Sequence, residues 1–493
     1  MLKKIDRFIA KIEPPNWVLL ISSFVFLLRI PSLFEPYYYG DEMIYLTLGN
    51  AVRNGLTLYS QIHDNKPPLI YILAAVAGNL AIYRAILLFW MLVTIAIFWH
   101  LTKVLFEKNV RAQQVAVTIF AFLTTLPLLE GQIVNAEIFL IGPTILAILL
   151  LLKDPTKKHI IIAGVAFAVA ALFKIPAVFD IPVVIIYWLI NAVNSKDIKI
   201  IIKRTVTLFI AFIIPIALTF VWYALHNAAL DYFKAAFLEN IGYLSSWSGN
   251  NQTSFVVRNA PLFIKGGIVL LGLIILRIKS SKLSKSFLIA AIWLLTSLFA
   301  ATLSGRPYPH YMIQVVPAFS LLIAILVTSQ KFEQVLAIIP LSLVPLALVY
   351  YHFWYYPTFP YYENFISFAT GQESKWQYFN NIDKSTEDNY NTAKLIMLTS
   401  ANSDKVFVWG EEAPTIYALS HRLPPIKYAA DYHITDFSSL PATVDTLSNN
   451  PPKLIVLLHG SPEIPGLNIL LNKEYAQISN SEINSQIWKL LKN

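Results

Sequence analysis

Long apolar runs recur along this chain, and short polar segments separate them. A helix of roughly 18 to 25 apolar residues is long enough to cross a hydrocarbon layer of about 30 Å. The pattern therefore predicts about eleven transmembrane helices. They cover residues 17–34, 82–105, 112–129, 137–152, 159–173, 176–193, 205–225, 260–277, 286–303, 310–329 and 334–354. Around Lys174-Ile175-Pro176 the sequence allows either two short helices or one long broken helix.

The loop between the first two predicted spans contains two shorter patterns. Residues 41–54 mix apolar and polar side chains with a helical period, and residues 67–77 begin an apolar segment too short to span a membrane alone. Both are typical of helices that lie in the membrane interface. Gly78-Asn79 predicts a turn before the next span.

The pattern changes after Tyr356, where charged residues, Asn and Ser become more frequent. Short β-like runs at residues 405–409 and 453–458 have helix-like stretches between them. Strands separated by helices indicate a small α/β unit. The sequence therefore predicts an α-helical membrane domain over residues 1–355 and a small α/β domain over residues 356–493.

Composition supports a membrane protein. The chain has 493 residues, of which 56% are hydrophobic and only 14% charged, and its mean hydropathy is +0.57. Such a chain is not a soluble globular protein throughout. The net charge of +9 comes from basic residues scattered between the spans rather than from one continuous patch, which excludes nucleic-acid binding. The absence of cysteine excludes disulfides and thiolate metal sites.

The distribution of Lys and Arg predicts the topology, because cytoplasmic loops carry an excess of basic residues. Residues 1–11 are basic, and the first apolar run follows without a small-residue cleavage site, so we expect a retained span and a cytoplasmic N-terminus. Alternate loops then carry the basic residues, and the C-terminal domain is expected outside the cytoplasm of a multi-pass cell-membrane protein. The predicted inside loops contain Lys103, Lys108, Arg111, Lys153, Lys157, Lys158, Lys196, Lys199, Lys203, Arg204, Arg277, Lys279, Lys282, Lys285 and Lys331.

Gly40-Asp41-Glu42, just after the first span, is the first candidate for chemistry. Neighbouring side chains on a helix diverge by about 100°, so we expect one carboxylate to be catalytic and the other to support it. Asp41 also suits a simpler role as the N-cap of the helix that follows.

Lys66 precedes Pro67-Pro68, whose rigid backbone fixes where the lysine side chain emerges. A lysine at the level of the lipid headgroups can hold a phosphate as a point charge. Snorkelling toward anionic headgroups explains such a lysine equally well.

Two further polar clusters lie between predicted spans. Glu130, Asn135 and Glu137 occupy a short loop, where Glu137 at a helix start suits a divalent cation, a sugar hydroxyl or the helix dipole. Arg306 and His310 lie in the second cluster and suit a phosphate, since guanidinium groups match phosphate oxygens. Its tyrosines, Tyr308 and Tyr311, also fit an ordinary interfacial belt. No histidine pair has the spacing of a zinc hydrolase.

Together these motifs resemble the GT-C glycosyltransferases, in the branch of the protein O-mannosyltransferases and lipid A aminoarabinose transferases that includes bacterial RgtA/B/C/D-like proteins. The resemblance covers roughly residues 15–330. The residues that carry it are Gly40-Asp41-Glu42, Tyr59, Asp64-Asn65-Lys66-Pro67-Pro68-Leu69-Ile70-Tyr71, Arg84, Asn135-Ala136-Glu137, Gly305-Arg306 and His310-Tyr311.

The resemblance implies an inverting transfer of one sugar from a polyprenyl-phosphate carrier to a lipid, glycan or protein acceptor at the outer face of the membrane. It implies that Asp41 is the general base or orients the acceptor hydroxyl, with Glu42 beside it. Lys66 would bind the carrier phosphate. The remaining implied roles are assistance at the phosphate by Arg306 and His310, substrate binding by Asp64, Tyr59, Glu137 and Tyr311, and a possible divalent metal at Asp41 or Glu137.

Two other classes of protein stay open at this point. A transporter or flippase for a lipid-linked envelope precursor would place ionisable residues in the centres of its spans, whereas here the charges gather in the loops. A non-catalytic envelope scaffold with a binding ectodomain would retain partner binding without any transfer activity.

Overall fold

The computed structural model describes residues 14–153, 155–242, 255–329, 331–479 and 483–491. The predicted cytoplasmic N-terminus, residues 1–11, lies outside the described residues. The chain forms two compact units. Unit 1 consists of Met1–Ile30, Leu87–Thr219 and Ile241–Pro357, and unit 2 of Pro31–Ile86, Phe220–Asn240 and Thr358–Asn493. Unit 2 therefore combines the predicted first outer loop with the C-terminal domain.

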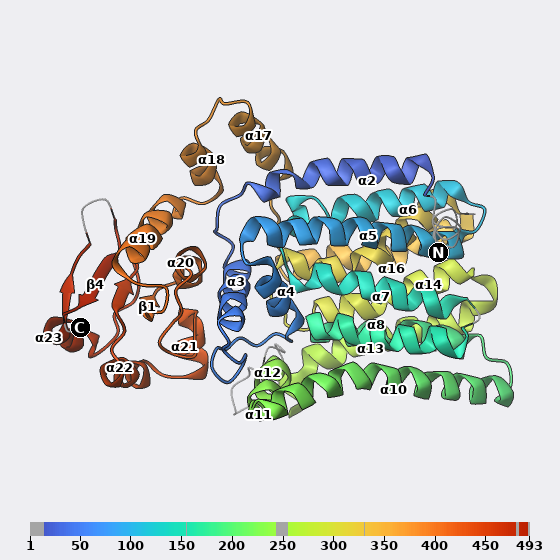
Figure 1. Cartoon of the computed structure of the whole chain (residues 1–493). Helices are drawn as coiled ribbons and strands as arrows, with labels where there is room; N and C mark the ends of the chain where they lie inside the picture. Colours follow the sequence, from blue (N-terminus) through green and yellow to red (C-terminus); the bar gives the residue numbers. More distant parts are fainter. Residues whose placement is uncertain (1–13, 154, 243–254, 330, 480–482, 492–493) are drawn as a thin grey trace, which may run out of the picture. The chain divides into compact units, whose positions relative to one another are not determined.

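Unit 1 is built from long apolar helices (Figure 1). One of them overlaps each predicted span, so a helix is confirmed at each predicted position. They are α2 (Asn16–Arg29), α5 (Leu80–Phe106), α6 (Val110–Leu123), α7 (Ala136–Leu152), α8 (Lys157–Phe173), α9 (Pro182–Ile190), α10 (Ser195–Leu225), α13 (Phe255–Lys279), α14 (Lys285–Ala301), α15 (Val316–Thr328) and α16 (Lys331–Tyr350). Within the described residues, five helical segments are long and apolar enough to cross a membrane, and five more are shorter apolar helices.

The sequence around Lys174 forms two short helices rather than one broken helix. Helix α8 ends at Phe173 because Lys174 has an extended backbone (φ −157°, ψ 129°). Pro176 then lies in the first turn of a 3₁₀ helix, η3 (Ile175–Asp180), where its missing N–H costs nothing. The predicted span 310–329 likewise begins with a 3₁₀ helix, η6 (Pro309–Gln314), before α15.

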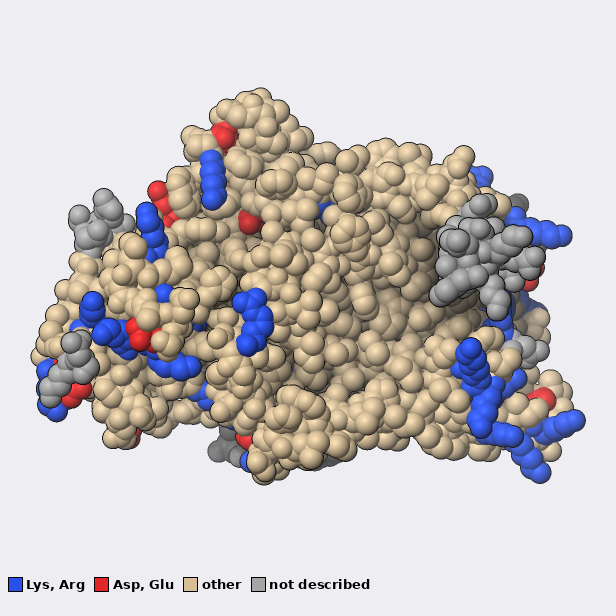
Figure 2. Space-filling model, viewed as in Figure 1, with Lys and Arg blue, Asp and Glu red and all other residues tan. Residues whose placement is uncertain are grey.

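The outer surfaces of the long helices in unit 1 are apolar. Ile210 and Leu218 on α10, Ile264 on α13 and Ile339 on α16 are each more than half exposed. On the face that Figure 2 shows, residues other than Lys, Arg, Asp and Glu cover the middle of the helices of unit 1, and Lys and Arg side chains gather at one end of them. An apolar surface of this extent is typical of contact with lipid. Unit 1 is a helical membrane domain.

Helices α3 (Gly40–Arg53) and α4 (Leu69–Ala77) of unit 2 match the two predicted helices of the first loop. Gly49 allows their close approach, because a Cβ there would lie 2.6 Å from the Ala74 carbonyl carbon. Helix α20 (Ala413–Ser420) packs on α3 as well. The polar side chains Thr47 and Asn50 of α3 donate hydrogen bonds to the carbonyls of Pro414 and His421. Their position in a membrane interface stays a prediction.

The C-terminal part of unit 2 contains the predicted α/β domain. The two predicted strands are confirmed as β1 (Val406–Trp409) and β2 (Leu454–Leu457), which pair in parallel. Two shorter strands that the sequence did not predict, β3 (Tyr475–Gln477) and β4 (Gln486–Leu490), complete a sheet of order β1-β2-β4-β3 in the described residues. The other elements of unit 2 are α11 (Ala229–Phe233), a π-helical turn (Lys234–Leu238), α17 (Thr358–Ala369), α18 (Lys375–Ile382), α19 (Thr386–Thr399), α21 (Asp431–Phe437), α22 (Leu440–Asn449) and α23 (Leu467–Glu474). The first two residues of α12 (Glu239–Gly242) also belong to unit 2.

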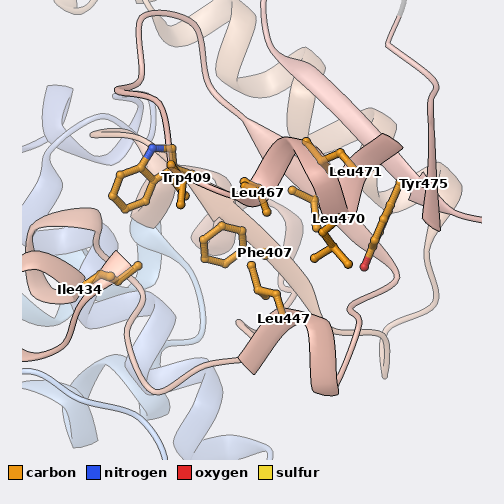
Figure 3. Packing of buried hydrophobic residues seen from close by; sticks show 10 residues of the cluster. Phe407, Trp409, Ile434, Leu447, Leu467, Leu470, Leu471 and Tyr475 are labelled. Atoms are coloured by element: carbon orange, nitrogen blue, oxygen red, sulfur yellow. The ribbon is translucent and has the colours of Figure 1, made fainter. Parts of the chain in front are cut away.

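The α/β domain has its own hydrophobic core (Figure 3). Phe407 of β1 and Ile455 of β2 are fully buried and pack with Leu447 of α22 and Leu471 of α23. All four residues of β1 are buried, which explains why its run of apolar residues is continuous rather than alternating.

Replacing Gly49 by alanine should lower the thermal stability of the purified protein. The added Cβ would meet backbone atoms of α4, which cannot move aside as a flexible side chain can, at a cost of about 1–3 kcal/mol. The control is Gly267→Ala on α13, where a Cβ meets no atom within 4 Å. Melting temperatures in detergent test this, and an unchanged value for Gly49→Ala would contradict the close packing.

Candidate active site

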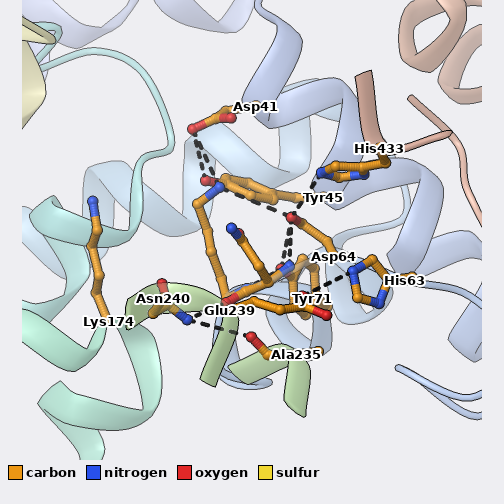
Figure 4. Close-up of polar contacts among 12 residues, drawn as sticks. Asp41, Tyr45, His63, Asp64, Tyr71, Lys174, Ala235, Glu239, Asn240 and His433 are labelled. Carbon is orange, nitrogen blue, oxygen red and sulfur yellow. Dashed lines mark hydrogen bonds and ion pairs between the residues drawn. The ribbon is translucent and has the colours of Figure 1, made fainter. Parts of the chain in front are cut away.

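A lysine between two carboxylates forms the centre of the candidate site in unit 2. Lys66 Nζ lies 3.6 Å from Asp41 Oδ2 and 3.9 Å from Asp64 Oδ2. The Asp41 side chain is 28% exposed, whereas that of Asp64 is 1% exposed. The two acids therefore differ in kind, because only Asp41 can meet a substrate. In Figure 4, Asp41 and Asp64 lie on opposite sides of Tyr45, and Tyr71 lies beyond Asp64.

Local structure fixes Asp41. Helix α3 begins at Gly40 with Tyr39 as its N-cap residue, so Asp41 lies in the first turn rather than at the N-cap. A carboxylate there is stabilised by the helix dipole. The Tyr45 hydroxyl, one turn further along α3, donates a hydrogen bond of 3.1 Å to Asp41 Oδ2.

The backbone of Lys66 is held on both sides. The Tyr59 hydroxyl donates to the Lys66 carbonyl over 2.9 Å, and the Lys66 N–H donates to the Tyr71 hydroxyl over 3.2 Å. Tyr59 is fully buried among the rings of Tyr223 and Tyr232. Sequence reasoning expected Tyr59 to bind substrate, but its hydroxyl contacts the backbone of Lys66.

Asp64 is a buried anion. Burial alone would raise its pKa, but the charge of Lys66, the nearby His433 imidazole and hydrogen bonds from Tyr71 and the Asn65 N–H together lower it. The Tyr71 hydroxyl donates over 2.7 Å, and the Asn65 N–H does so over the same distance. Asp64 therefore keeps its negative charge beside Lys66.

Histidines from two segments surround Asp64. His433 Nε2, on α21 of the C-terminal domain, lies 3.5 Å from Asp64 Oδ1. His63 Nε2 lies 3.2 Å from Glu239 Oε2, and the His63 N–H donates to the Lys427 carbonyl. Figure 4 shows both imidazoles beside Asp64. The segment after α10 adds Asn240, whose amide donates over 2.7 Å to the Asn65 carbonyl.

Glu42 belongs to a different cluster from Asp41. Arg84 at the start of α5 binds both Glu42 oxygens through Nε and Nη2, and its Nη1 lies 2.7 Å from Glu35 Oε2. The Ser32 carbonyl accepts a further hydrogen bond from Nη1, and the Tyr361 hydroxyl donates to Glu35. All three charged side chains are fully buried. The Glu42 carboxylate is thus engaged by a guanidinium rather than presented to a substrate.

Unit 1 contains a second polar cluster. His310 Nδ1 contacts Glu130 Oε2, and Lys174 Nζ contacts Glu137 Oε1. His310 Nε2 lies 3.7 Å from the same Glu137 oxygen, and Lys174 Nζ lies 4.0 Å from the centre of the Tyr311 ring. The predicted residues Glu137, His310 and Tyr311 are therefore brought together.

Arg306 differs from its predicted neighbours, because its side chain is exposed in the loop before η6. Its backbone N–H donates to the Ser304 hydroxyl. As for a metal, no group of three His, Cys, Asp or Glu side chains that could hold an ion is found among the residues that the structure describes.

Sequence reasoning missed His433, Glu239, Asn240 and Lys174. The first three lie far along the chain from Asp64, in segments without a recognisable motif. Lys174 did carry a signal, because it is a charged residue in a two-residue gap between apolar runs.

The fold has solved counterparts. The structure is similar to that of ArnT from Cupriavidus metallidurans bound to undecaprenyl phosphate, with a TM-score of 0.56, 13% identity, and coverage of 96% of this chain and 98% of that chain. The apo state of the same protein gives a TM-score of 0.55 at 12% identity, over 96% and 97% of the two chains. The chain has the GT-C fold. No protein-family model and no curated protein sequence matches it.

Within this GT-C fold, Arg84→Met should be strongly destabilising. It would leave Glu35 and Glu42 buried without a cation, at a cost of about 3–5 kcal/mol. The triple variant Arg84→Met/Glu35→Gln/Glu42→Gln should recover much of the loss, since it removes both charges. Arg53→Met, at an exposed position of α3, is the control. Thermal unfolding in detergent measures the relative stabilities of these variants. A triple variant no more stable than Arg84→Met would contradict this account.

The contribution of His433 to stability should depend on pH. Burial, aided by the charge of Lys66 and the neighbouring His63, outweighs Asp64 and Asp436 and lowers the His433 pKa to about 4. Between pH 6.5 and 4 the unfolded chain then binds a proton that the folded chain does not, so stability falls as the pH falls through this window. The loss amounts to about 3 kcal/mol.

The difference in melting temperature between wild type and His433→Phe separates the contribution of His433 from that of the other titrating groups. It should favour the wild type more at pH 7.5 than at pH 4.5. The same difference at both pH values would contradict the lowered pKa.

Proposed function

We propose that this chain is a membrane glycosyltransferase that transfers a sugar, with inversion, from a polyprenyl-phosphate-linked donor to a lipid, glycan or protein acceptor. The observation that carries the proposal is the ammonium of Lys66 lying 3.6 Å from the partly exposed carboxylate of Asp41. A cation and a base this close suit a reaction in which a phosphate leaves and a hydroxyl attacks. The similarity to an ArnT structure with bound undecaprenyl phosphate supports this class of donor.

Asp41 and Lys66 have complementary roles in the proposed reaction. The acceptor oxygen forms a bond to the anomeric carbon while the bond from that carbon to the phosphate oxygen breaks. Asp41 takes the proton of the acceptor hydroxyl, which makes the oxygen a better nucleophile. The phosphate leaves with the electron pair, and Lys66 stabilises its growing negative charge.

The other residues of unit 2 position these two. Asp64, Tyr59 and Tyr71 hold Lys66, on the contacts described above. Glu42 fixes the first turn of α3 through Arg84, and so supports Asp41 rather than reacting itself. For Asp64 and Tyr59 this replaces the substrate binding expected from the sequence, whereas Glu42 takes the supporting role expected for one of the two neighbouring carboxylates.

In unit 1, the proposal keeps Glu137, Tyr311, His310 and Arg306 as substrate-binding residues. Glu137 and His310 are buried in one polar cluster with Lys174, a mixture of acceptors and donors that suits sugar hydroxyls or phosphate oxygens. A divalent metal at Asp41 or Glu137 stays part of the sequence-based hypothesis.

The proposed topology places the N-terminus in the cytoplasm and the α/β domain, residues 356–493, outside it. The support is the alternation of basic loops along the sequence and their position at one end of the helices of unit 1 (Figure 2). Reaction at the outer face follows from this placement.

Asp41→Asn should lower kcat by about 10²–10⁴-fold while the donor KM changes little, because the base acts only in the transition state. Lys66→Met should raise the donor KM at least about tenfold in addition to lowering kcat. The measurement is release of polyprenyl phosphate from a panel of polyprenyl-phosphate sugars by the purified protein. Asp231→Asn and Lys427→Met, which break a partly exposed ion pair of the same unit, are matched controls.

Equal release by wild type and Asp41→Asn would refute the role of Asp41. No release by the wild type across a broad panel of donors would refute the enzymatic proposal, and transport of a lipid-linked precursor would then be tested.

A further inference from the structure

His433, on α21 of the C-terminal domain, reaches the candidate site. Its side chain is 2% exposed, and its Nε2 lies 3.5 Å from Oδ1 of Asp64, which is itself 1% exposed. Asp64 in turn lies 3.9 Å from the ammonium of Lys66. Three residues from α21 and the first loop thus form one row, in which His433 and Asp64 are buried and Lys66 is partly exposed. Figure 4 shows His433 and Asp64 of this row.

The imidazole is suited to donate to Asp64. Its lowered pKa keeps it neutral at pH 7, so only one of its nitrogens carries a proton. Nδ1 is buried without a hydrogen-bond partner among the described residues. A proton on Nε2 faces the Asp64 carboxylate, whereas a proton on Nδ1 would be a buried donor without a partner and would leave the Nε2 lone pair against a carboxylate oxygen. This favours the proton on Nε2.

The ring cannot easily turn away. Phe437 and Tyr432 of the same helix lie 5.6 Å and 4.3 Å from it, measured between ring centres, and the His63 ring meets it edge-on at 5.9 Å. His63 is tied to the C-terminal domain through the Lys427 carbonyl. These contacts come from both the first loop and the α/β domain. The position of His433 therefore depends on the packing of the α/β domain against the first loop.

We propose that the C-terminal domain supplies His433 as a positioning residue for the phosphate-binding Lys66, acting through Asp64. This inference rests on the proposed function. The Nε2–H of His433 satisfies one oxygen of the buried carboxylate without adding charge. Without this hydrogen bond, the Asp64 carboxylate would attract the ammonium of Lys66 more strongly. Lys66 would then move away from Asp41 and from the phosphate.

The proposal predicts that the α/β domain is part of the donor site. His433→Phe keeps a ring of similar size but removes the donor, whereas His433→Gln keeps an N–H that can reach Asp64. His433→Phe should weaken binding of undecaprenyl phosphate about tenfold, and His433→Gln should restore binding to within a few-fold of wild type. His459→Phe, at an exposed position of the same domain, is the control.

The experiment measures Kd for undecaprenyl phosphate with the purified full-length protein, together with kcat and KM for an active donor. His433→Phe and Asp64→Asn are also combined in one chain. Because His433 acts through Asp64, the double variant should bind no more weakly than Asp64→Asn alone. If His433→Phe does not fold, His433→Leu takes its place with the same expectation.

Wild-type affinity in a folded His433→Phe protein would overturn the inference, as would independent, additive losses in the double variant. Equally weakened binding of undecaprenyl phosphate in the Phe and Gln variants would also overturn it, because His433 would then contribute only by its packing. Lys66→Met separates this from the proposed function. If Lys66→Met binds undecaprenyl phosphate as tightly as wild type does, the proposed role of Lys66 in phosphate binding fails. If Lys66→Met loses affinity and His433→Phe does not, only the role of His433 fails.

Discussion

The ion cluster around Arg84 fixes the geometry of unit 2. A guanidinium buried with two carboxylates must keep its partners close, because leaving any of these charges alone in the interior costs several kcal/mol. Arg84 therefore ties the start of α5 to α3 through Glu42 and to the preceding loop through Glu35. Since Asp41 is the neighbour of Glu42 on the same helix turn, anchoring Glu42 also sets the direction of Asp41. One buried contact thus orients the residue proposed to be catalytic.

Most of the fold could be predicted because its signals are local. Apolar runs located each long helix, and continuous burial made β1 and β2 readable as unbroken apolar runs. Strands β3 and β4 escaped prediction because they are short and mixed in character. Only the pairing of β4 with β2, and of β3 with β4, makes them strands. A pairing between distant segments leaves no pattern within either segment.

The candidate site divides in the same way. Asp41 and Lys66 stood out because a polar motif beside a long apolar run is unusual, and the structure places them together. The different roles of Asp41 and Glu42 could not be predicted, because they depend on the ion pairs of Arg84. Those ion pairs bring together three segments of the chain. The roles of His433 and Glu239 could not be predicted for the same reason, because a single histidine or glutamate in a polar segment has many possible partners.

Unit 2 is assembled from three stretches of chain, and its last stretch begins at Thr358. The polar groups of Thr47 and Asn50 find their partners only when Pro414 and His421 have been synthesised. Early in biosynthesis, α3 therefore has an incomplete environment while hundreds of later residues are still to be made. A chain that ends before residue 430 would contain the helices of unit 1 together with Asp41 and Lys66, but it would lack His433, so it would hold the candidate site only in part.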